Sequence, residues 1–349
     1  MANIYRYSIV GHKNIYLNEE QKQRELVIEY GEPIDGVNSE TGLLILVPGY
    51  GGNINSNVYR KMKKEIPDKY NMIVMQCDYF GNKYMHSDNP KILESLLSCQ
   101  NLEKIILEWK CTPADMGETI NEFNDMGIMQ ALDIVNSTLN FIIMNLRDGK
   151  EINMNKIVLF GHSHGAYISY IANRICPKLY SYIIDISSYI YPYYINNDRD
   201  IMYTFGEIGR EELIIEPFVK ENKEVLYDEK LYNLKYLYEK FENNCNIIAV
   251  HGTEDWMVPI SEKKSFIDKI DNAEIVIITP DMVDEKLFKN ADHGLGADYL
   301  ELVDVFLPMI ANNTERKSEL ELDAIVNVND ELIISYQTGI PELQYIKFN

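Results

Sequence analysis

Three side chains that together could carry out nucleophilic catalysis lie far apart in the sequence, at Ser163, Asp255 and His293. A serine hydroxyl becomes a good nucleophile when a base removes its proton, and a histidine serves as that base when an acid orients its ring. Ser163 is the centre of a Gly-x-Ser-x-Gly pattern at residues 161–165. These residue types predict attack on an ester, thioester or amide carbonyl and a covalent acyl-enzyme.

The residues around Ser163 are typical of a nucleophile held at a tight turn. The apolar run 156–160 predicts a strand before the serine, and residues 166–175 predict a helix after it. Glycines are needed on both sides because the strained turn leaves no room for side chains. We therefore expect the hydroxyl to project above a sheet, at a helix N-terminus that favours developing negative charge.

The acid and the histidine each follow a predicted strand. Asp255 comes shortly after the apolar run 246–250, and His293 lies in a loop between the run 274–278 and the last predicted helix. The order serine, acid, histidine is the one found where a strand–serine–helix turn carries the nucleophile. The sequence thus predicts that these three side chains converge.

Several neighbouring residues have competing interpretations. Asp185 and Glu254 stay open as alternative acids, and His293 could instead be a surface histidine in an ordinary Asp-His-Gly loop. We expect His162 to act through packing. His251 ends a predicted strand, and we expect it to be buried and hydrogen bonded rather than catalytic.

The segments that would position these residues alternate between strand and helix. Short apolar runs predict central strands covered on both faces, at residues 43–47, 72–75, 156–160, 182–186, 246–250 and 274–278. Two β-like stretches precede them at residues 4–10 and 25–30. Helical spacing occurs in residues 57–65, 128–146, 166–175, 261–270 and 299–310. This alternation predicts an α/β fold with a mostly parallel sheet and helices on both faces.

Three segments fall outside the alternation. Residues 81–125 and 187–241 are predicted insertions, and the nine tyrosines of the second favour a lid over the site. Residues 1–311 would then form one domain that carries both insertions. Residues 312–349 turn polar and then β-like, which predicts a C-terminal extension with a β-hairpin. A small binding or oligomerisation element is the alternative for this extension.

These motifs resemble those of the α/β-hydrolase superfamily. The strand followed by Asp255-x-x-Val-Pro is similar to that of serine esterases and prolyl-oligopeptidase-type catalytic domains, and the likeness covers about residues 43–310. It implies an α/β-hydrolase fold. Residues 121–133 also resemble an uncharacterised bacterial family of such hydrolases found with flagellin-glycosylation genes.

The resemblance also implies an oxyanion hole made of two backbone N–H groups. One donor would be His164, the residue after the nucleophile. The other would be Tyr50, in the glycine-rich loop 48–52, where Pro48 replaces the more common histidine. A backbone donor is unaffected by that replacement.

Composition excludes several other classes of protein. The 54 acidic and 33 basic residues give a net charge of −21, which repels nucleic acid and anionic membrane surfaces. No apolar run approaches the roughly 20 residues that cross a bilayer. Residues 1–7 lack the features of a secretory signal, so we expect a cytoplasmic protein.

The same charge disfavours an anionic substrate unless basic side chains gather locally, for example Arg199, Arg210 or Lys220. The pair His162-x-His164 has no third and fourth ligand at useful spacing, so we expect neither a metal nor a cofactor.

The predicted function is hydrolysis of an ester by a carboxylesterase or deacylase acting on a small molecule, with an acylated sugar as one candidate. An acyltransferase or a serine peptidase would use the same triad. The 42 residues before the strand at 43–47 are too few for the propeller that gates prolyl-oligopeptidase-type enzymes. A binding protein with this fold and a vestigial triad is the alternative from another class.

Overall fold

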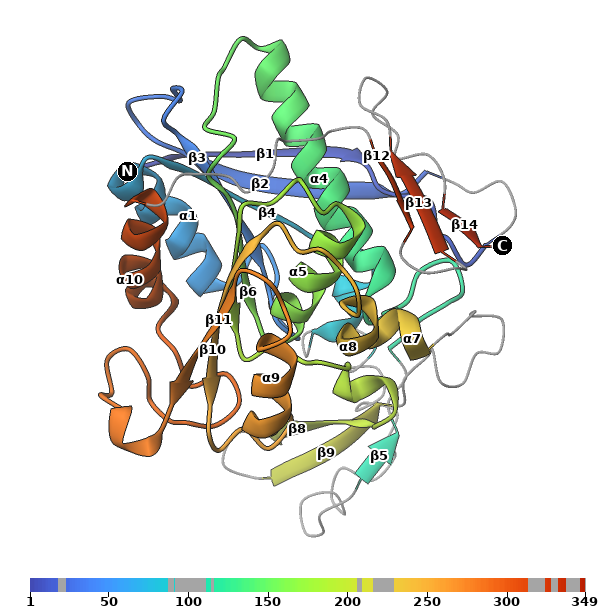
Figure 1. Cartoon of the computed structure of the whole chain (residues 1–349). Coiled ribbons are helices and arrows are strands. Elements are labelled where there is room, and N and C mark those ends of the chain that lie inside the picture. The colour runs from blue at the N-terminus through green and yellow to red at the C-terminus, as the bar shows by residue number, and fades with distance from the viewer. Residues whose placement is uncertain are drawn as a thin grey trace.

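One sheet of eight strands organises the chain (Figure 1). The computed structural model describes residues 1–17, 23–86, 91, 111–113, 116–205, 209–215, 229–312, 324–327, 332–336 and 346–348. The strand order is β1-β2-β4-β3-β6-β7-β10-β11. The strand bounds are Asn3–Val10 (β1), Glu25–Glu32 (β2), Gly42–Val47 (β3), Met72–Cys77 (β4), Ile157–His162 (β6), Tyr182–Ile186 (β7), Asn246–Gly252 (β10) and Ala273–Ile278 (β11).

Strand directions give the sheet its character. β2 runs antiparallel to its neighbours β1 and β4, and every other neighbouring pair is parallel. All six apolar runs predicted as central strands lie in this sheet. The last of them, β11, is an edge strand rather than a central one, and its residues alternate between exposed and partly buried up to the buried Ile278. A mostly parallel sheet with this order is the α/β-hydrolase fold, which confirms the predicted fold class.

Helices cover both faces of the sheet (Figure 1). One face carries α1 (Asn57–Tyr70) and α10 (Tyr299–Asn312). The other face carries α4 (Ile128–Arg147), α5 (His164–Ile175), α8 (Leu234–Leu237) and α9 (Ile260–Ile267). The shorter helices are η1 (Asn82–Met85), η2 (Tyr193–Ile195), η3 (Pro280–Met282) and α7 (Glu229–Tyr232).

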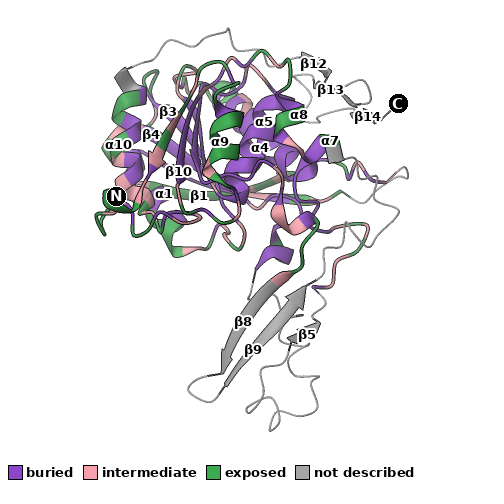
Figure 2. Cartoon of the chain, turned by 60° about the horizontal axis from the view of Figure 1, so that its bottom comes forward, coloured by how far each residue is buried: buried purple, intermediate pink, exposed green. Residues whose placement is uncertain are grey.

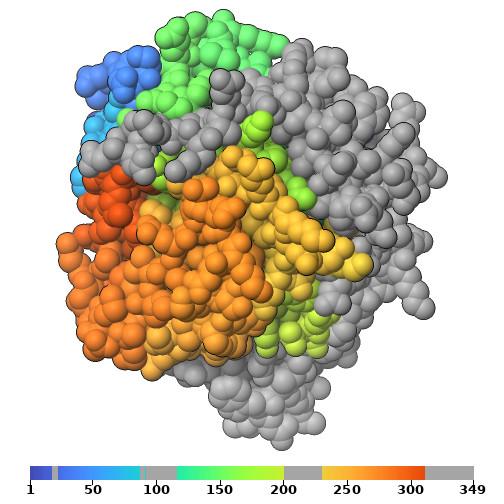
Figure 3. Space-filling view, in the orientation of Figure 1, coloured from blue at the N-terminus to red at the C-terminus, as the bar shows by residue number. Residues whose placement is uncertain are grey.

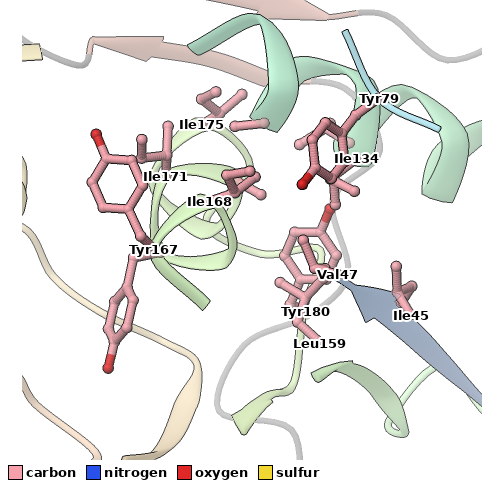
Figure 4. Packing of buried hydrophobic residues seen from close by; sticks show 14 of the residues in the cluster. Ile45, Val47, Tyr79, Ile134, Leu159, Tyr167, Ile168, Ile171, Ile175 and Tyr180 are labelled. Atoms are coloured by element: carbon pink, nitrogen blue, oxygen red, sulfur yellow. The ribbon is translucent and has the colours of Figure 1, made fainter. Parts of the chain in front are cut away.

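The alternation of side chains along each strand builds two hydrophobic cores. In β3, Ile45 and Val47 pack in the core shared with α4 and α5, and Leu44 and Leu46 pack in the core shared with α1 and α10. Figure 4 shows the first core, with Ile168 and its neighbours on α5 beside the strand residues. Buried residues fill the central strands and α4 and α5 in Figure 2.

The two predicted insertions meet in a second, three-stranded sheet. β5 (Cys111–Pro113) pairs in parallel with β9 (Gly209–Ile215), and β8 (Arg199–Phe205) pairs antiparallel with β9. Both ends of the predicted lid belong to the body, since Tyr189, Tyr232 and Tyr238 are buried in the main core. Residues 206–208 and 216–228 of that segment lie outside the described residues, as do residues 87–90, 92–110 and 114–115 of the first insertion.

The C-terminal extension forms a third sheet. β12 (Ala324–Asn327) pairs antiparallel with β13 (Leu332–Tyr336), where a hairpin is predicted. β14 (Ile346–Phe348) pairs antiparallel with β13 and adds a strand that the sequence pattern did not indicate.

Candidate active site

Ser163 occupies the turn between β6 and α5 in a backbone conformation that residues with side chains rarely adopt (φ 51°, ψ −118°). A Cβ atom at Gly165 would lie 2.0 Å from the Val47 carbonyl oxygen, and one at Gly161 would lie 2.4 Å from Cα of Ala166. Both positions therefore require glycine. The turn predicted from the pattern at residues 161–165 is the turn that forms.

The structure brings Ser163, His293 and Asp255 into one hydrogen-bonded chain. The Ser163 Oγ lies 2.7 Å from His293 Nε2, and His293 Nδ1 lies 2.9 Å from Asp255 Oδ2. Asp255 follows β10, and His293 lies in the loop between β11 and α10. All three thus gather at the carboxyl end of the sheet. The His293 side chain keeps 14% of its surface exposed, whereas the Asp255 side chain is fully buried.

The carboxylate of Asp255 is held in one orientation by backbone amides. Its Oδ1 accepts hydrogen bonds from the N–H groups of Met257 (2.9 Å) and Val258 (3.0 Å). Burial alone would raise the pKa of Asp255, but the hydrogen bond and charge of His293 and the Val258 amide leave that pKa below its ordinary value. Asp255 therefore stays ionised and can stabilise a positively charged His293.

Tyr189 covers one face of the His293 ring. The two ring centroids are 5.5 Å apart and the planes differ by 8°. Tyr189 is itself buried, at 2% exposure. The stack and the bond to Asp255 together restrict the imidazole to one plane. Sequence reasoning grouped Tyr189 with the lid tyrosines and gave no sign of this contact.

The alternative acids lie in other environments. Asp185 forms a fully buried ion pair with Lys263, at 2.6 Å, and Glu254 is exposed to solvent. His251 is buried, as expected, with Nε2 2.8 Å from the Val258 carbonyl oxygen and 3.5 Å from Asp255 Oδ2. Of the candidate acids, Asp255 alone has a hydrogen bond to His293 among the described residues.

The two predicted oxyanion donors come from two different segments, Tyr50 from the loop after β3 and His164 from the start of α5. His164 is the first residue of α5, and the Tyr50 ring lies 6.0 Å from the His164 ring. Neither backbone N–H donates a hydrogen bond to another described residue. Unpaired amides beside a nucleophile suit the stabilisation of an oxyanion.

The two histidines that flank Ser163 have different surroundings. The His162 ring packs between two loops, because Cβ atoms at Gly49 and Gly294 would lie 2.8 and 2.7 Å from its Nδ1 and Nε2 atoms. His164 is fully buried, with Nε2 2.7 Å from Gln130 Oε1. Burial lowers the pKa of His162 to about 4, with a smaller contribution from His293, and lowers the pKa of His164 to about 3. Both rings are therefore neutral near pH 7.

A family model described as "Protein of unknown function (DUF2920)" matches residues 114–343, which is 230 of the 349 residues. The chain belongs to the DUF2920 family. No curated protein matches the DUF2920 chain.

Two solved structures share the fold of this DUF2920 chain. One, from Bacteroides ovatus ATCC 8483, is named as a candidate dipeptidyl aminopeptidase IV; the identity is 12%, the TM-score is 0.52, and the match covers 90% of this chain and 36% of that one. The other is the acylaminoacyl peptidase of Pyrococcus horikoshii, with 14% identity, a TM-score of 0.50 and coverage of 92% and 43%. The DUF2920 chain thus spans less than half the length of either protein. At these identities the likeness establishes the fold.

A row of aromatic side chains runs from the loop after β10, which contains Asp255, to the loop that contains Tyr50. The row consists of Trp256, Tyr193, Tyr194 and Tyr50, with successive ring centroids 5.6, 5.3 and 5.2 Å apart. Trp256 follows Asp255 directly and is 61% exposed. Figure 3 shows the segment after β10, coloured orange, at the molecular surface. The tyrosine-rich sequence indicated aromatic cover, but it did not predict this row or its direction.

Two further findings concern the described residues alone. No group of three or more His, Cys, Asp or Glu side chains among them is arranged to hold a metal ion. None of the helices in the described ranges has both the length and the apolar composition that crossing a membrane requires.

Proposed function

We propose that this protein is a serine hydrolase that cleaves an ester through Ser163, His293 and Asp255. The observation that carries the proposal is the unbroken chain of hydrogen bonds, 2.7 Å and 2.9 Å long, from the Ser163 hydroxyl through His293 to Asp255. The strained serine turn and the unpaired amides beside it support the same function.

In the first half of the reaction, His293 Nε2 takes the proton of Ser163 Oγ as that oxygen bonds to the carbonyl carbon. The carbonyl oxygen becomes negatively charged and is stabilised by the N–H groups of Tyr50 and His164. Asp255 holds the Nδ1 proton of His293 and stabilises the imidazolium. His293 then returns its proton to the leaving alcohol, and an acyl-enzyme remains.

In the second half, His293 removes a proton from water, and the resulting hydroxide attacks the acyl carbon. The bond to Ser163 Oγ breaks, this oxygen regains a proton from His293, and a carboxylic acid is released. An acceptor alcohol in place of water would make the protein an acyltransferase. We favour hydrolysis by a carboxylesterase or deacylase.

Two observations favour particular classes of substrate. The resemblance of residues 121–133 to hydrolases found with flagellin-glycosylation genes favours an acylated sugar. The names of the two structural neighbours favour a peptidase as the second candidate. Aromatic rings such as Trp256 can pack against the flat face of a sugar or against an apolar peptide side chain.

Labelling with a fluorophosphonate probe tests the proposal. We expect the probe to label the wild-type protein and not the Ser163→Ala variant, and we expect labelling of Ser8→Ala, in which an exposed serine on β1 is changed, to be unaffected. A folded wild-type protein that takes no label would favour a binding protein with this fold.

Turnover of small substrates then separates the enzyme classes. An esterase hydrolyses short 4-nitrophenyl esters much faster than dipeptide amides, and a peptidase cleaves the amides. Addition of an alcohol acceptor separates transfer from hydrolysis, because a transferase forms a new ester rather than a free acid.

The organisation around this function also stays a prediction. We propose that residues 1–311 form the hydrolase domain and that residues 312–349 are an extension through which copies of the chain could associate. A cytoplasmic location is part of the same proposal.

A further inference from the structure

We propose that Arg199 binds a carboxylate of the substrate, so that the natural ester is an anion. This inference rests on the proposed ester hydrolysis and names a property of its substrate. The proposal is based on a partly buried guanidinium group that lies against the predicted oxyanion loop and has no carboxylate partner among the described residues.

Arg199 is placed against this loop by three contacts. Its Cζ atom lies 3.9 Å from the centroid of the Tyr50 ring, and its Nη2 lies 3.8 Å from the position that a Cβ atom at Gly51 would occupy. Its Nη1 donates a hydrogen bond of 2.8 Å to the carbonyl oxygen of Met85. The cation–π stack and this hydrogen bond fix the guanidinium plane at the end of the aromatic row.

Arg199 lacks an ion pair with the carboxylates that the structure describes. Two other partly exposed arginines, Arg6 and Arg24, each form an ion pair with a carboxylate, on Glu29 and Asp133. Arg199 has no ion pair with any described carboxylate, although the chain has 54 acidic residues for 33 basic ones. A partly buried cation without a counter-ion is costly, and an anionic ligand would remove that cost.

Glu118, an acidic residue that acts on the Tyr50 hydroxyl, already accepts a hydrogen bond. Glu118 raises the pKa of Tyr50, after the larger effect of burial, whereas Arg199 lowers it. The Glu118 carboxylate accepts a hydrogen bond of 2.7 Å from the backbone N–H of Asn124. One N–H group of Arg199 donates to the Met85 carbonyl oxygen, and the guanidinium group has further N–H donors. This planar group can bind a carboxylate through two parallel hydrogen bonds.

The size of the charge favours a carboxylate over a phosphate. One guanidinium balances a single negative charge, whereas a phosphate monoester carries nearly two at pH 7. The net charge of −21 repels anions in general, so affinity for an anionic ester would have to come from a local cation. The aromatic row joins the loop of Asp255 to Arg199 and could hold the flat part of such a substrate.

Pairs of esters in which a free carboxylate is compared with its methyl ester provide the test, with the spontaneous hydrolysis of each ester subtracted. The first pair is 4-acetoxybenzoate and its methyl ester, which place the carboxylate on the leaving alcohol. The second pair is mono-4-nitrophenyl glutarate and methyl 4-nitrophenyl glutarate, which place it on the acyl part. Each ester is measured with the wild-type protein, with Arg199→Met, and with Arg60→Met, which removes an exposed arginine from α1.

We expect wild type to hydrolyse the charged member of at least one pair with a kcat/KM about tenfold or more above that of its neutral partner. The free energy of a hydrogen bond to a charged group corresponds to a ratio of about this size. Arg199→Met should abolish this preference by lowering kcat/KM for the charged ester about tenfold more than for its neutral partner. Arg60→Met should keep the preference, and the pair that shows it identifies which part of the ester carries the anion.

Two results would overturn the inference while the proposed function stands. Wild type could show no preference for either charged ester, or Arg199→Met could lower the rates of charged and neutral esters equally, as expected if Arg199 only supports β8. Failure of the proposed function is a different result: neither the neutral esters nor the fluorophosphonate probe would react with Ser163, and the inference would fall with it.

Discussion

Two clusters at the carboxyl ends of neighbouring strands contain the same kinds of side chain, a carboxylate, a base and a serine. The first consists of Asp255, His293 and Ser163, and the second of Asp185, Lys263 and Ser188. In the second cluster the Asp185 carboxylate lies 2.6 Å from Lys263 Nζ and also accepts hydrogen bonds from the Tyr170 hydroxyl (2.8 Å) and the Ser188 N–H (2.8 Å).

The clusters differ in how far their side chains are exposed to solvent and in whether polar groups beside them lack hydrogen-bond partners. Lys263 and Asp185 have no exposed side-chain surface, and their polar atoms are bonded to one another. Ser163 instead sits in a strained turn beside two unpaired amides, and His293 is partly exposed. Residue types alone therefore do not make an active site. Partial exposure and free donors for an oxyanion distinguish the proposed catalytic cluster from the sealed one.

The largest effect should come from breaking the accessible cluster. Ser163→Ala removes the nucleophile, and we expect turnover of a 4-nitrophenyl ester to fall by about 10⁴-fold or more. The free energy of unfolding should change by less than about 1 kcal/mol, because one hydroxyl is lost from a rigid turn. Ester kinetics and urea unfolding measure the two quantities. A variant that retains the wild-type rate would show that another residue is the nucleophile.

The next effect separates the two carboxylates. Asp255→Asn keeps the shape of the side chain but removes the charge that stabilises protonated His293, and we expect kcat to fall by about 10³- to 10⁴-fold. Asp185→Asn should change kcat by less than about tenfold, since Asp185 pairs with Lys263. Steady-state kinetics of both variants show which of the two carboxylates supports His293. If Asp185→Asn has the larger effect on kcat, Asp255 is not the acid of the triad.

The sequence predicts the parts of this arrangement that depend on contacts between residues close together in the chain. The turn at Ser163 follows from local crowding, which the glycines at 161 and 165 reveal. The α/β-hydrolase fold follows from the alternation of apolar runs and helical segments. Asp255 and His293 are predictable because each follows a strand of that fold.

The contacts that the sequence does not predict depend on long-range packing. Tyr189 and Arg199 come from a segment without clear periodicity, so nothing local indicates which ring or loop they reach. The pairing of β5 with β9 joins residues about a hundred positions apart. Helix α1 is predicted to end near residue 65 but continues past Pro67 to Tyr70. The carbonyl of Lys63, which Pro67 cannot use, lies against Gly31.

The sealed cluster should respond in stability rather than in chemistry. Lys263→Met leaves the Asp185 carboxylate buried without a counter-ion, and we expect the free energy of unfolding to fall by about 3–5 kcal/mol. The double variant Asp185→Asn/Lys263→Met removes both charges and keeps an acceptor for the Tyr170 hydroxyl. It should recover much of the loss in urea unfolding.

An exposed ion pair of similar length is the control for this prediction. Lys235 and Glu262 are also 2.6 Å apart, but both side chains are more than 40% exposed. Lys235→Met should cost less than about 1 kcal/mol because solvent screens the pair. Equal losses in Lys235→Met and Lys263→Met, or a double variant less stable than Lys263→Met, would contradict a structural role for the buried charges.

The smallest effect concerns two histidines beside Ser163: His293, which is hydrogen bonded to Ser163, and His164, which follows Ser163 in the sequence. His293 is accessible, whereas His164 is sealed and burial lowers its pKa to about 3. The unfolded chain binds a proton on this residue below about pH 6.5, and the folded chain does not until about pH 3. His164 should therefore lower stability as the pH falls through this window, by about 1.4 kcal/mol per pH unit.

Comparison of wild type with His164→Gln isolates this contribution. The buried carboxyl of Asp125, whose pKa burial raises to about 6, acts in the opposite direction between about pH 4 and 6, since its folded form binds the extra proton. Asp125 is present in both proteins, so its effect cancels in the difference. We expect the stability of His164→Gln, measured by urea unfolding from pH 7.5 to 5, to fall less steeply than that of wild type. Parallel curves would mean that the ring next to Ser163 can be protonated in the folded state, and that the region around the nucleophile is less sealed than its burial indicates.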